Sequence, residues 1–226
     1  MIARLARALR LAISIVAVGI SASVFASGSV RQAFVLAGLK KLSLIMPPEY
    51  AFAGDSLTAR CDWRWRISQN PLSVVNLAVE GAVIRQISDQ VSDANIMRAR
   101  FVMIDAGIND VFQNTPVDQL ERDFEWLLRQ VGAQQKGIVT LIPYISDAAF
   151  SERIANANRS IVAITKTHGV PVIDLNAQLA SDGVRRPEMT TDGIHFSRLA
   201  CSIWIKDVRR ELNRSNPAEI VQCVSP

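Results

Sequence analysis

The chain has 226 residues, of which 49% are hydrophobic and 20% charged, an ordinary composition for a globular protein. This length suffices for one α/β domain with a sizeable core and leaves little room for a second. The formal net charge is +4, but Arg4, Arg7 and Arg10 contribute three of these charges, which leaves +1 for residues 27–226. The isoelectric point of 9.2 is therefore no sign of nucleic-acid binding, and no nucleic-acid partner is expected.

The N-terminal residues 1–26 combine a basic start with an apolar stretch of small residues, residues 11–26. Val24-Phe25-Ala26 before Ser27 fits a signal-peptide cleavage site. A cleaved secretory signal and an uncleaved signal anchor both fit this pattern, although the stretch is short for a membrane span. Either interpretation places the rest of the chain in the cell envelope outside the cytoplasm: periplasmic, secreted, or anchored to the inner membrane by the N-terminal segment.

Residues 27–48 are expected to form a helical connector, because Lys40 and Lys41 interrupt their apolar pattern and argue against a second span. Pro47-Pro48 then marks the start of the folded domain, residues 49–226. Short apolar runs alternate with helical patterns through this domain. The expected strands are residues 49–53, 73–78, 101–106, 136–143 and 170–175. The expected helices are residues 57–68, 83–97, 116–131, 151–167 and 197–212.

This alternation predicts an α/β fold, a three-layer α/β/α sandwich around a five-stranded parallel sheet. The alternation does not determine the strand order, and we expect a flavodoxin-like order, 2-1-3-4-5. Thr115 is expected to cap the helix over 116–131, with Pro116 at its first position. Residues 176–195 are expected to be mostly loop. The basic and aromatic segment 60–66 is expected to be a solvated helix face with apolar anchors. In such sheets, ligands bind at the carboxyl ends of the strands.

Three cysteines, Cys61, Cys201 and Cys223, allow one disulfide and one free thiol in an oxidising compartment. A bond between Cys201 and Cys223 would join the tail to the last helix, and a bond between Cys61 and Cys201 is equally compatible with the sequence. No CxxC motif or His/Cys cluster suggests a metal, and no cofactor is expected.

Ser56 follows the first strand and is the candidate nucleophile, because a hydroxyl there needs only a base to accept its proton. The chain has two histidines. His168 ends a predicted helix, where a structural role is expected. His195 follows a polar loop, with Asp192 three residues earlier to accept its N–H and stabilise the charged ring. Asp105 and Asp174 are weaker candidates for that orienting acid.

Asn109 follows the third strand, and its side-chain amide could donate a hydrogen bond to the oxyanion that forms in acyl transfer. The backbone N–H groups of Ser56 and Gly81 could add two more donors, since glycine offers no side chain to block the substrate. Asp55 and Asp110 are expected to have supporting roles: Asp55 in the loop after the first strand, and Asp110 in the turn after Asn109.

Four motifs in this order resemble those of the SGNH or GDSL-type serine hydrolases, a superfamily of esterases and lipases. They are Gly54-Asp55-Ser56-Leu57, Gly81, Gly107-Ile108-Asn109-Asp110 and Asp192-Gly193-Ile194-His195. The resemblance covers residues 49 to about 212. It implies Ser56, His195 and Asp192 as catalytic residues, Ser56, Gly81 and Asn109 as oxyanion donors, and a three-layer fold without a metal. The Gly-x-Ser-x-Gly motif of α/β-hydrolases is absent.

The expected function is therefore a serine hydrolase that cleaves carboxylic esters through an acyl-enzyme. Its substrates could be acetyl groups on a cell-envelope glycan, lysolipids or small acyl esters, and the compact chain, without an obvious lid, weakens the case for a lipase. Two alternatives remain at this stage. One is a non-catalytic, membrane-tethered binding module with the same fold, and the other is an acyltransferase that uses the same residues.

Overall fold

The computed structural model describes residues 28–215, so the expected leader and Cys223 lie outside the described residues. The chain divides into two units, residues 1–47 and 48–226. In the first unit, the segment expected to be a helical connector contains helix α2 (Gly28–Ser43). Among residues 28–215, no helix combines the length and the apolar character that crossing a bilayer requires.

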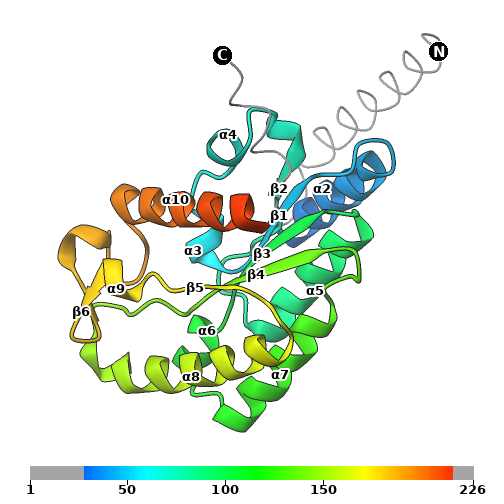
Figure 1. Ribbon diagram of the computed structural model, residues 1–226. Coiled ribbons are helices and arrows are strands. Elements are labelled where there is room, and N and C mark those ends of the chain that lie inside the picture. The colour runs from blue at the N-terminus through cyan, green and yellow to red at the C-terminus, as the bar shows by residue number, and fades with distance from the viewer. Residues whose placement is uncertain (1–27, 216–226) are drawn as a thin grey trace, which may run out of the picture. The chain divides into compact units, whose positions relative to one another are not determined.

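The second unit is built on a parallel five-stranded sheet (Figure 1). Its strands are β1 (Tyr50–Ala53), β2 (Val74–Asn76), β3 (Phe101–Asp105), β4 (Lys136–Thr140) and β5 (Val172–Ile173). The strand order is β2-β1-β3-β4-β5, which confirms the predicted topology. In the register of the sheet, Tyr50 pairs with Val74 on one side and with Phe101 on the other. The central strand β3 is buried throughout, as expected for an apolar run covered on both faces.

Helices cover both faces of this sheet and complete the predicted three-layer fold (Figure 1). One layer consists of α5 (Ile84–Ile96), α7 (Val117–Arg129) and α8 (Ser151–Thr167). The other consists of α10 (Arg198–Ser215) with the short helices α3 (Ser56–Ala59) and α4 (Arg64–Ile67). The remaining helices are α6 (Ile108–Phe112), α9 (Asn176–Leu179) and the 3₁₀ turns Pro71–Ser73, Ala148–Phe150 and Pro187–Met189.

The helix predicted over 57–68 is wrong, because the chain breaks it into α3 and α4. Trp63, between them, is almost fully buried, and its indole N–H donates to the Thr58 carbonyl at 2.8 Å. Its ring stacks on Phe52 of β1 with centroids 4.2 Å apart and meets the edge of Trp204 of α10. Packing of this large side chain outweighs the local helical preference. Trp63 is thus one of the expected apolar anchors, while Trp65 is exposed.

The segment predicted as loop, 176–195, contains α9 and a small hairpin, β6 (Ala180–Ser181) and β7 (Val184–Arg185). Two-residue strands are too short to show periodicity, although Asp182-Gly183 is a typical hairpin turn and both residues have positive φ. α6 was not predicted either. Strands β4 and β5 are shorter than predicted, and Pro116 occupies the N-cap of α7 in place of Thr115.

Cys61 and Cys201 form the disulfide, with Cα atoms 5.7 Å apart. This settles the pairing that the sequence left open. The bond joins the segment after α3 to α10, so it links the chain just beyond Ser56 to the chain just beyond His195.

Replacing both Cys61 and Cys201 by serine should lower the free energy of unfolding by about 2–5 kcal/mol, because the unfolded chain loses a constraint that closes a long loop. Urea unfolding measured by circular dichroism tests this. Dithiothreitol should destabilise the wild type by a similar amount and leave the double variant unchanged. Equal stability of the two proteins without reductant would contradict this role for the disulfide.

Candidate active site

Ser56 is the first residue of α3, directly after β1, in a turn that its neighbours hold tightly. Asp55 caps α3, since its carboxylate accepts a hydrogen bond from the Leu57 N–H at 2.8 Å. Gly54 has no room for a side chain, because a Cβ would lie 2.3 Å from Thr58 Oγ1. Gln90 of α5 bonds both backbone groups of Gly54, accepting from its N–H at 2.7 Å and donating to its carbonyl at 3.1 Å. The half-buried Ser56 is thus presented from a rigid turn.

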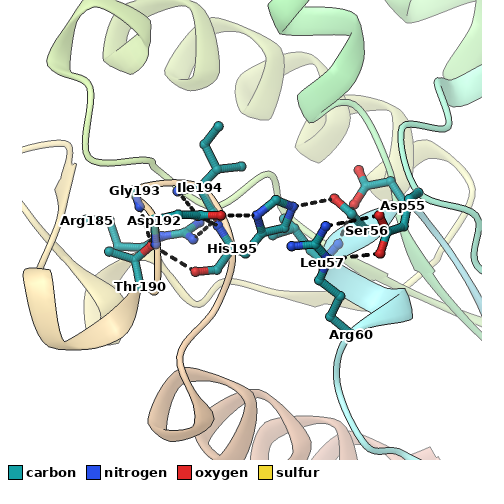
Figure 2. A network of polar contacts seen from close by, with 11 residues as sticks. Asp55, Ser56, Leu57, Arg60, Arg185, Thr190, Asp192, Gly193, Ile194 and His195 are labelled. Carbon is teal, nitrogen blue, oxygen red and sulfur yellow. Dashed lines mark hydrogen bonds and ion pairs between the residues drawn. The ribbon is translucent and has the colours of Figure 1, made fainter.

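Ser56, His195 and Asp192 form one hydrogen-bonded row (Figure 2). His195 Nε2 lies 3.0 Å from Ser56 Oγ, and His195 Nδ1 lies 2.6 Å from Asp192 Oδ2. The serine and the histidine are 139 residues apart in the chain. They meet because both lie at the carboxyl-end edge of the sheet, where the sequence analysis expected them. A base in contact with a hydroxyl and oriented by a carboxylate is the arrangement that activates a serine.

The loop that carries Asp192 and His195 is ordered by its own hydrogen bonds. Asp192 Oδ1 accepts from the backbone N–H groups of His195 at 2.8 Å and Ile194 at 3.0 Å. The bond from the His195 N–H, followed by the bond to its ring, holds the pKa of Asp192 well below its usual range. Thr190 Oγ1 donates to the His195 carbonyl and accepts from the Gly193 N–H, each at 2.8 Å. Asp192 therefore stays ionised, and the ring of His195 is fixed from both ends.

The three expected oxyanion donors differ in whether they already have a hydrogen-bond acceptor in the structure. Within residues 28–215, the N–H groups of Ser56 and Gly81 donate to no other group. Gly81 has φ +77°, which favours glycine, and a Cβ there would meet open space. Asn109 Nδ2 donates to the Ala82 carbonyl at 2.9 Å and lies 3.4 Å from Asp55 Oδ2. Asn109 is thus held in a fixed orientation between two segments of the site.

Three carboxyl groups lie buried beneath these residues. Asp110 Oδ2 accepts from the Ile84 N–H at 3.0 Å and so caps α5, and Thr58 Oγ1 donates to Asp105 at 3.1 Å. Burial raises the pKa of Asp105 to about 7 and that of Asp110 to about 6. Burial, together with the nearby Asp105 charge, raises the pKa of Asp55 well above its usual range. Their hydrogen bonds give all three a supporting position, and His195 takes Asp192, not Asp105, as its partner.

These buried groups should make the fold less stable as pH rises. Their pKa values are higher in the folded than in the unfolded chain, so the folded state binds more protons between the two values. The free energy of unfolding should therefore fall by more than about 1 kcal/mol between about pH 4 and about pH 7. Urea unfolding across this range measures it. Asp110→Asn, which keeps an oxygen for the Ile84 N–H, should show a smaller fall, and an equal fall would contradict the assignment.

A charged pair borders the serine. Arg60 binds Glu80 through two hydrogen bonds, from Nε at 2.9 Å and from Nη2 at 3.0 Å, and both side chains are about half exposed. These bonds hold the pKa of Glu80 below its usual range, and the charge of Arg60 adds to this. Figure 2 shows Arg60 close to Ser56 and His195. The rim of the site is therefore polar on this side.

The other candidates lie away from the row. His168, at the end of α8, bonds Glu125 of α7 at 2.7 Å, which fits its expected structural role. Asp174 accepts from the Asn176 N–H at 2.8 Å and does not contact His195. Two buried polar residues that hold the site, Gln90 and Arg185, were not predicted from the sequence. A glutamine among the buried positions of α5 was a usable signal, whereas nothing in the local sequence marks Arg185.

Comparison with known proteins adds an independent observation. The model of the GDSL-like Lipase/Acylhydrolase family matches residues 52–200. No curated protein matches the sequence.

Solved structures with this fold include a GDSL-like lipase from Bacteroides thetaiotaomicron, with a TM-score of 0.64 and 17% identity over 80% of this chain and 99% of the other. A lipase/acylhydrolase from Enterococcus faecalis has a TM-score of 0.64 and 21% identity, covering 74% and 96%. An acetyl xylan esterase from Geobacillus stearothermophilus has a TM-score of 0.58 and 19% identity, covering 72% and 93%. At these identities the likeness concerns the fold.

Proposed function

We propose, since the chain belongs to the GDSL-like lipase/acylhydrolase family and is an ester-cleaving hydrolase, that it works through an acyl-enzyme on Ser56. The observation that carries this proposal is the row in which His195 Nε2 lies 3.0 Å from Ser56 Oγ and Asp192 holds the other ring nitrogen. The chemistry follows from that geometry.

Ser56 Oγ attacks the ester carbonyl carbon while His195 Nε2 accepts its proton. The bond from Nδ1 to Asp192 keeps the ring in the tautomer that has Nε2 free and stabilises the imidazolium that forms. As the tetrahedral intermediate collapses, the imidazolium protonates the alcohol oxygen, and the alcohol leaves. Water then attacks the acyl-enzyme with His195 again as the base, which releases the acid and restores Ser56.

The negative charge on the carbonyl oxygen needs donors that are already in place. The N–H groups of Ser56 and Gly81 have no other acceptor within the described part of the chain. Asn109 is the third donor of the proposal. Its Nδ2 carries two hydrogens, of which one bonds the Ala82 carbonyl at 2.9 Å and the other has only the long 3.4 Å contact with Asp55. That second hydrogen is the one proposed to turn to the oxyanion.

Replacing Asn109 by alanine should lower kcat by about 10²–10³-fold, because the transition state loses one fixed donor. Steady-state kinetics with a short p-nitrophenyl ester measures the effect. Asn158→Ala is unsuitable as a control because that side chain bonds both backbone groups of Ile142 in the core. Asn156→Ala on the exposed side of α8 is the better one and should leave kcat unchanged. An unchanged kcat in Asn109→Ala would remove Asn109 from the proposed mechanism.

The substrate we propose is a short acyl ester, above all an acetyl group, on a polar alcohol such as a sugar of a cell-envelope glycan. Support comes from the charged side chains near Ser56, which are the partly exposed Arg60–Glu80 pair and the half-exposed Asp192. Charged side chains of this kind suit hydroxyl-rich groups better than an acyl chain, so a lysolipid fits less well. A solved structure with this fold is named as an acetyl xylan esterase, so the fold occurs in a protein named for acetyl esters of a glycan.

Two substrate series test this. Hydrolysis of p-nitrophenyl acetate should exceed that of the octanoate ester, and acetylated oligosaccharides should release acetate that Ser56→Ala does not release. Preference for the long ester, together with hydrolysis of lysolipids but not of acetylated oligosaccharides, would overturn the substrate proposal and leave the serine chemistry intact.

We place the enzyme outside the cytoplasm, either free in the envelope or attached through its N-terminal segment. The basic and apolar residues 1–26 support this, as does the Cys61–Cys201 disulfide, since such bonds persist mainly in oxidising compartments. Fractionation of cells that produce the full chain tests it: recovery of the protein in the cytoplasmic fraction with reduced cysteines would contradict the assignment.

A further inference from the structure

Arg185 is the only arginine among the largest fully buried side chains of residues 28–215, with 1% of its surface exposed. It lies in β7 of the small hairpin, and its backbone N–H donates to the Ile145 carbonyl at 3.0 Å. A buried guanidinium is costly unless its charge and its N–H groups are matched by partners. The partners of Arg185 therefore indicate what it does.

Two of its three nitrogens bind backbone carbonyls from different segments. Nε donates to the Tyr144 carbonyl at 2.6 Å, just beyond β4, and Nη1 donates to the Ile194 carbonyl. Nη2 has no hydrogen-bond partner within residues 28–215. The hydrogen bonds of this side chain thus connect the segment after β4 to the residue directly before His195.

The guanidinium also contacts the residue directly after His195. Its Cζ lies 4.6 Å from the centre of the Phe196 ring, the distance of a cation–π contact. Figure 2 shows Arg185 against the loop that carries Asp192, Gly193 and Ile194. Arg185 therefore holds the loop on both sides of the catalytic histidine.

Two carboxyl groups, those of Asp105 and Asp192, act on the charge of Arg185. Burial lowers the pKa of Arg185 to about 10, and the charges of Asp105 and Asp192 act in the opposite direction. Arg185 is therefore a cation at neutral pH. Other bonds to the loop are neutral, such as that from the Ser146 N–H to the Gly193 carbonyl at 2.9 Å.

We infer that Arg185 is a positioning residue for the ester hydrolysis proposed above. It keeps His195 in reach of Ser56 by joining the Ile194 carbonyl and the Phe196 ring to the segment after β4, at Tyr144. It touches neither substrate nor Ser56. Its contribution is the placement of the imidazole, and displacing a catalytic group by about 1 Å costs about a hundredfold in rate.

The test combines four variants with a short p-nitrophenyl ester as substrate. Arg185→Met, close in length but without charge or donors, should lower kcat by about 10–100-fold and leave KM within about threefold, because the substrate site is intact while the base is misplaced. Arg185→Lys should fall between Met and wild type. In Arg185→Ala, added methylguanidinium should restore part of the lost kcat by occupying the vacated space. Arg186→Met, directly after β7 and paired with Glu188, is the matched control and should keep the wild-type kcat.

Wild-type kcat in Arg185→Met would overturn the inference, as would a loss in Arg185→Ala that methylguanidinium does not relieve at all. If Arg185→Met does not fold, Arg185→Lys decides: a lowered kcat at unchanged KM supports positioning, and an unchanged kcat contradicts it. Failure of the proposed function would look different, since Ser56→Ala would then remain active whatever happened at Arg185.

Discussion

Ser56→Ala should lower kcat for ester hydrolysis by about 10⁶-fold. Ser56 Oγ is the hydroxyl that lies 3.0 Å from His195 Nε2. Alanine removes the hydroxyl that His195 activates. Release of p-nitrophenol from the acetate ester, followed at high enzyme concentration, measures the loss. Urea unfolding should show that the variant is as stable as the wild type, because Ser56 is only half-buried.

Ser160→Ala is the matched control. Ser160 lies on α8, where its hydroxyl bonds Glu121, in the helix layer opposite α10. This variant should keep full activity. Hydrolysis at more than a small fraction of the wild-type rate in Ser56→Ala would mean that another group, or water activated directly by His195, carries the reaction.

Asp192→Asn should lower kcat by about 10³–10⁴-fold at neutral pH. The amide can present its NH₂ to His195 Nδ1, which would place the ring proton on Nε2 and remove its ability to accept the proton of Ser56. The negative charge that stabilises the imidazolium is lost as well. Kinetics with the same ester measures kcat, and KM should change little.

Asp174→Asn is the control, because the sequence also left Asp174 as a candidate partner of His195. In the structure its carboxylate accepts a hydrogen bond from the Asn176 N–H instead. Its kcat should equal that of the wild type. A large loss in Asp174→Asn, or none in Asp192→Asn, would contradict the assignment of the orienting acid.

Much of the fold was predictable because each strand and helix carries its own pattern. The helix over 151–167 begins and ends where predicted, and alternating strands and helices indicated the parallel five-stranded sheet. The predictions failed where contacts between residues far apart in the sequence determine the local structure. Trp63 packs in the core between Phe52 and Trp204, and this packing interrupts the helix that the local sequence favours. The hairpin of β6 and β7 has too few residues to show alternation.

The active site, like the fold, has a part that could be predicted from the sequence and a part that could not. Ser56 and His195 could be expected to meet, because loops at the carboxyl ends of parallel strands share one edge of the sheet. The residues that hold them could not be found by this reasoning. Gln90 reaches Gly54 across 36 residues, and Arg185 reaches Tyr144 across 41, so neither contact has a local signature. The orientation of Asn109 toward the Ala82 carbonyl likewise depends on packing that no motif encodes.

The central claim, that His195 and Asp192 make Ser56 an active nucleophile, is tested most directly by labelling with a fluorophosphonate. The probe forms a covalent bond with an activated serine and does not react with ordinary serines, so a non-catalytic binding module would remain unlabelled. Mass spectrometry of the digested protein should find one adduct per chain, on the peptide containing Ser56, and none in Ser56→Ala. An unlabelled wild-type protein that is folded, or an adduct at another residue that persists in Ser56→Ala, would contradict the account.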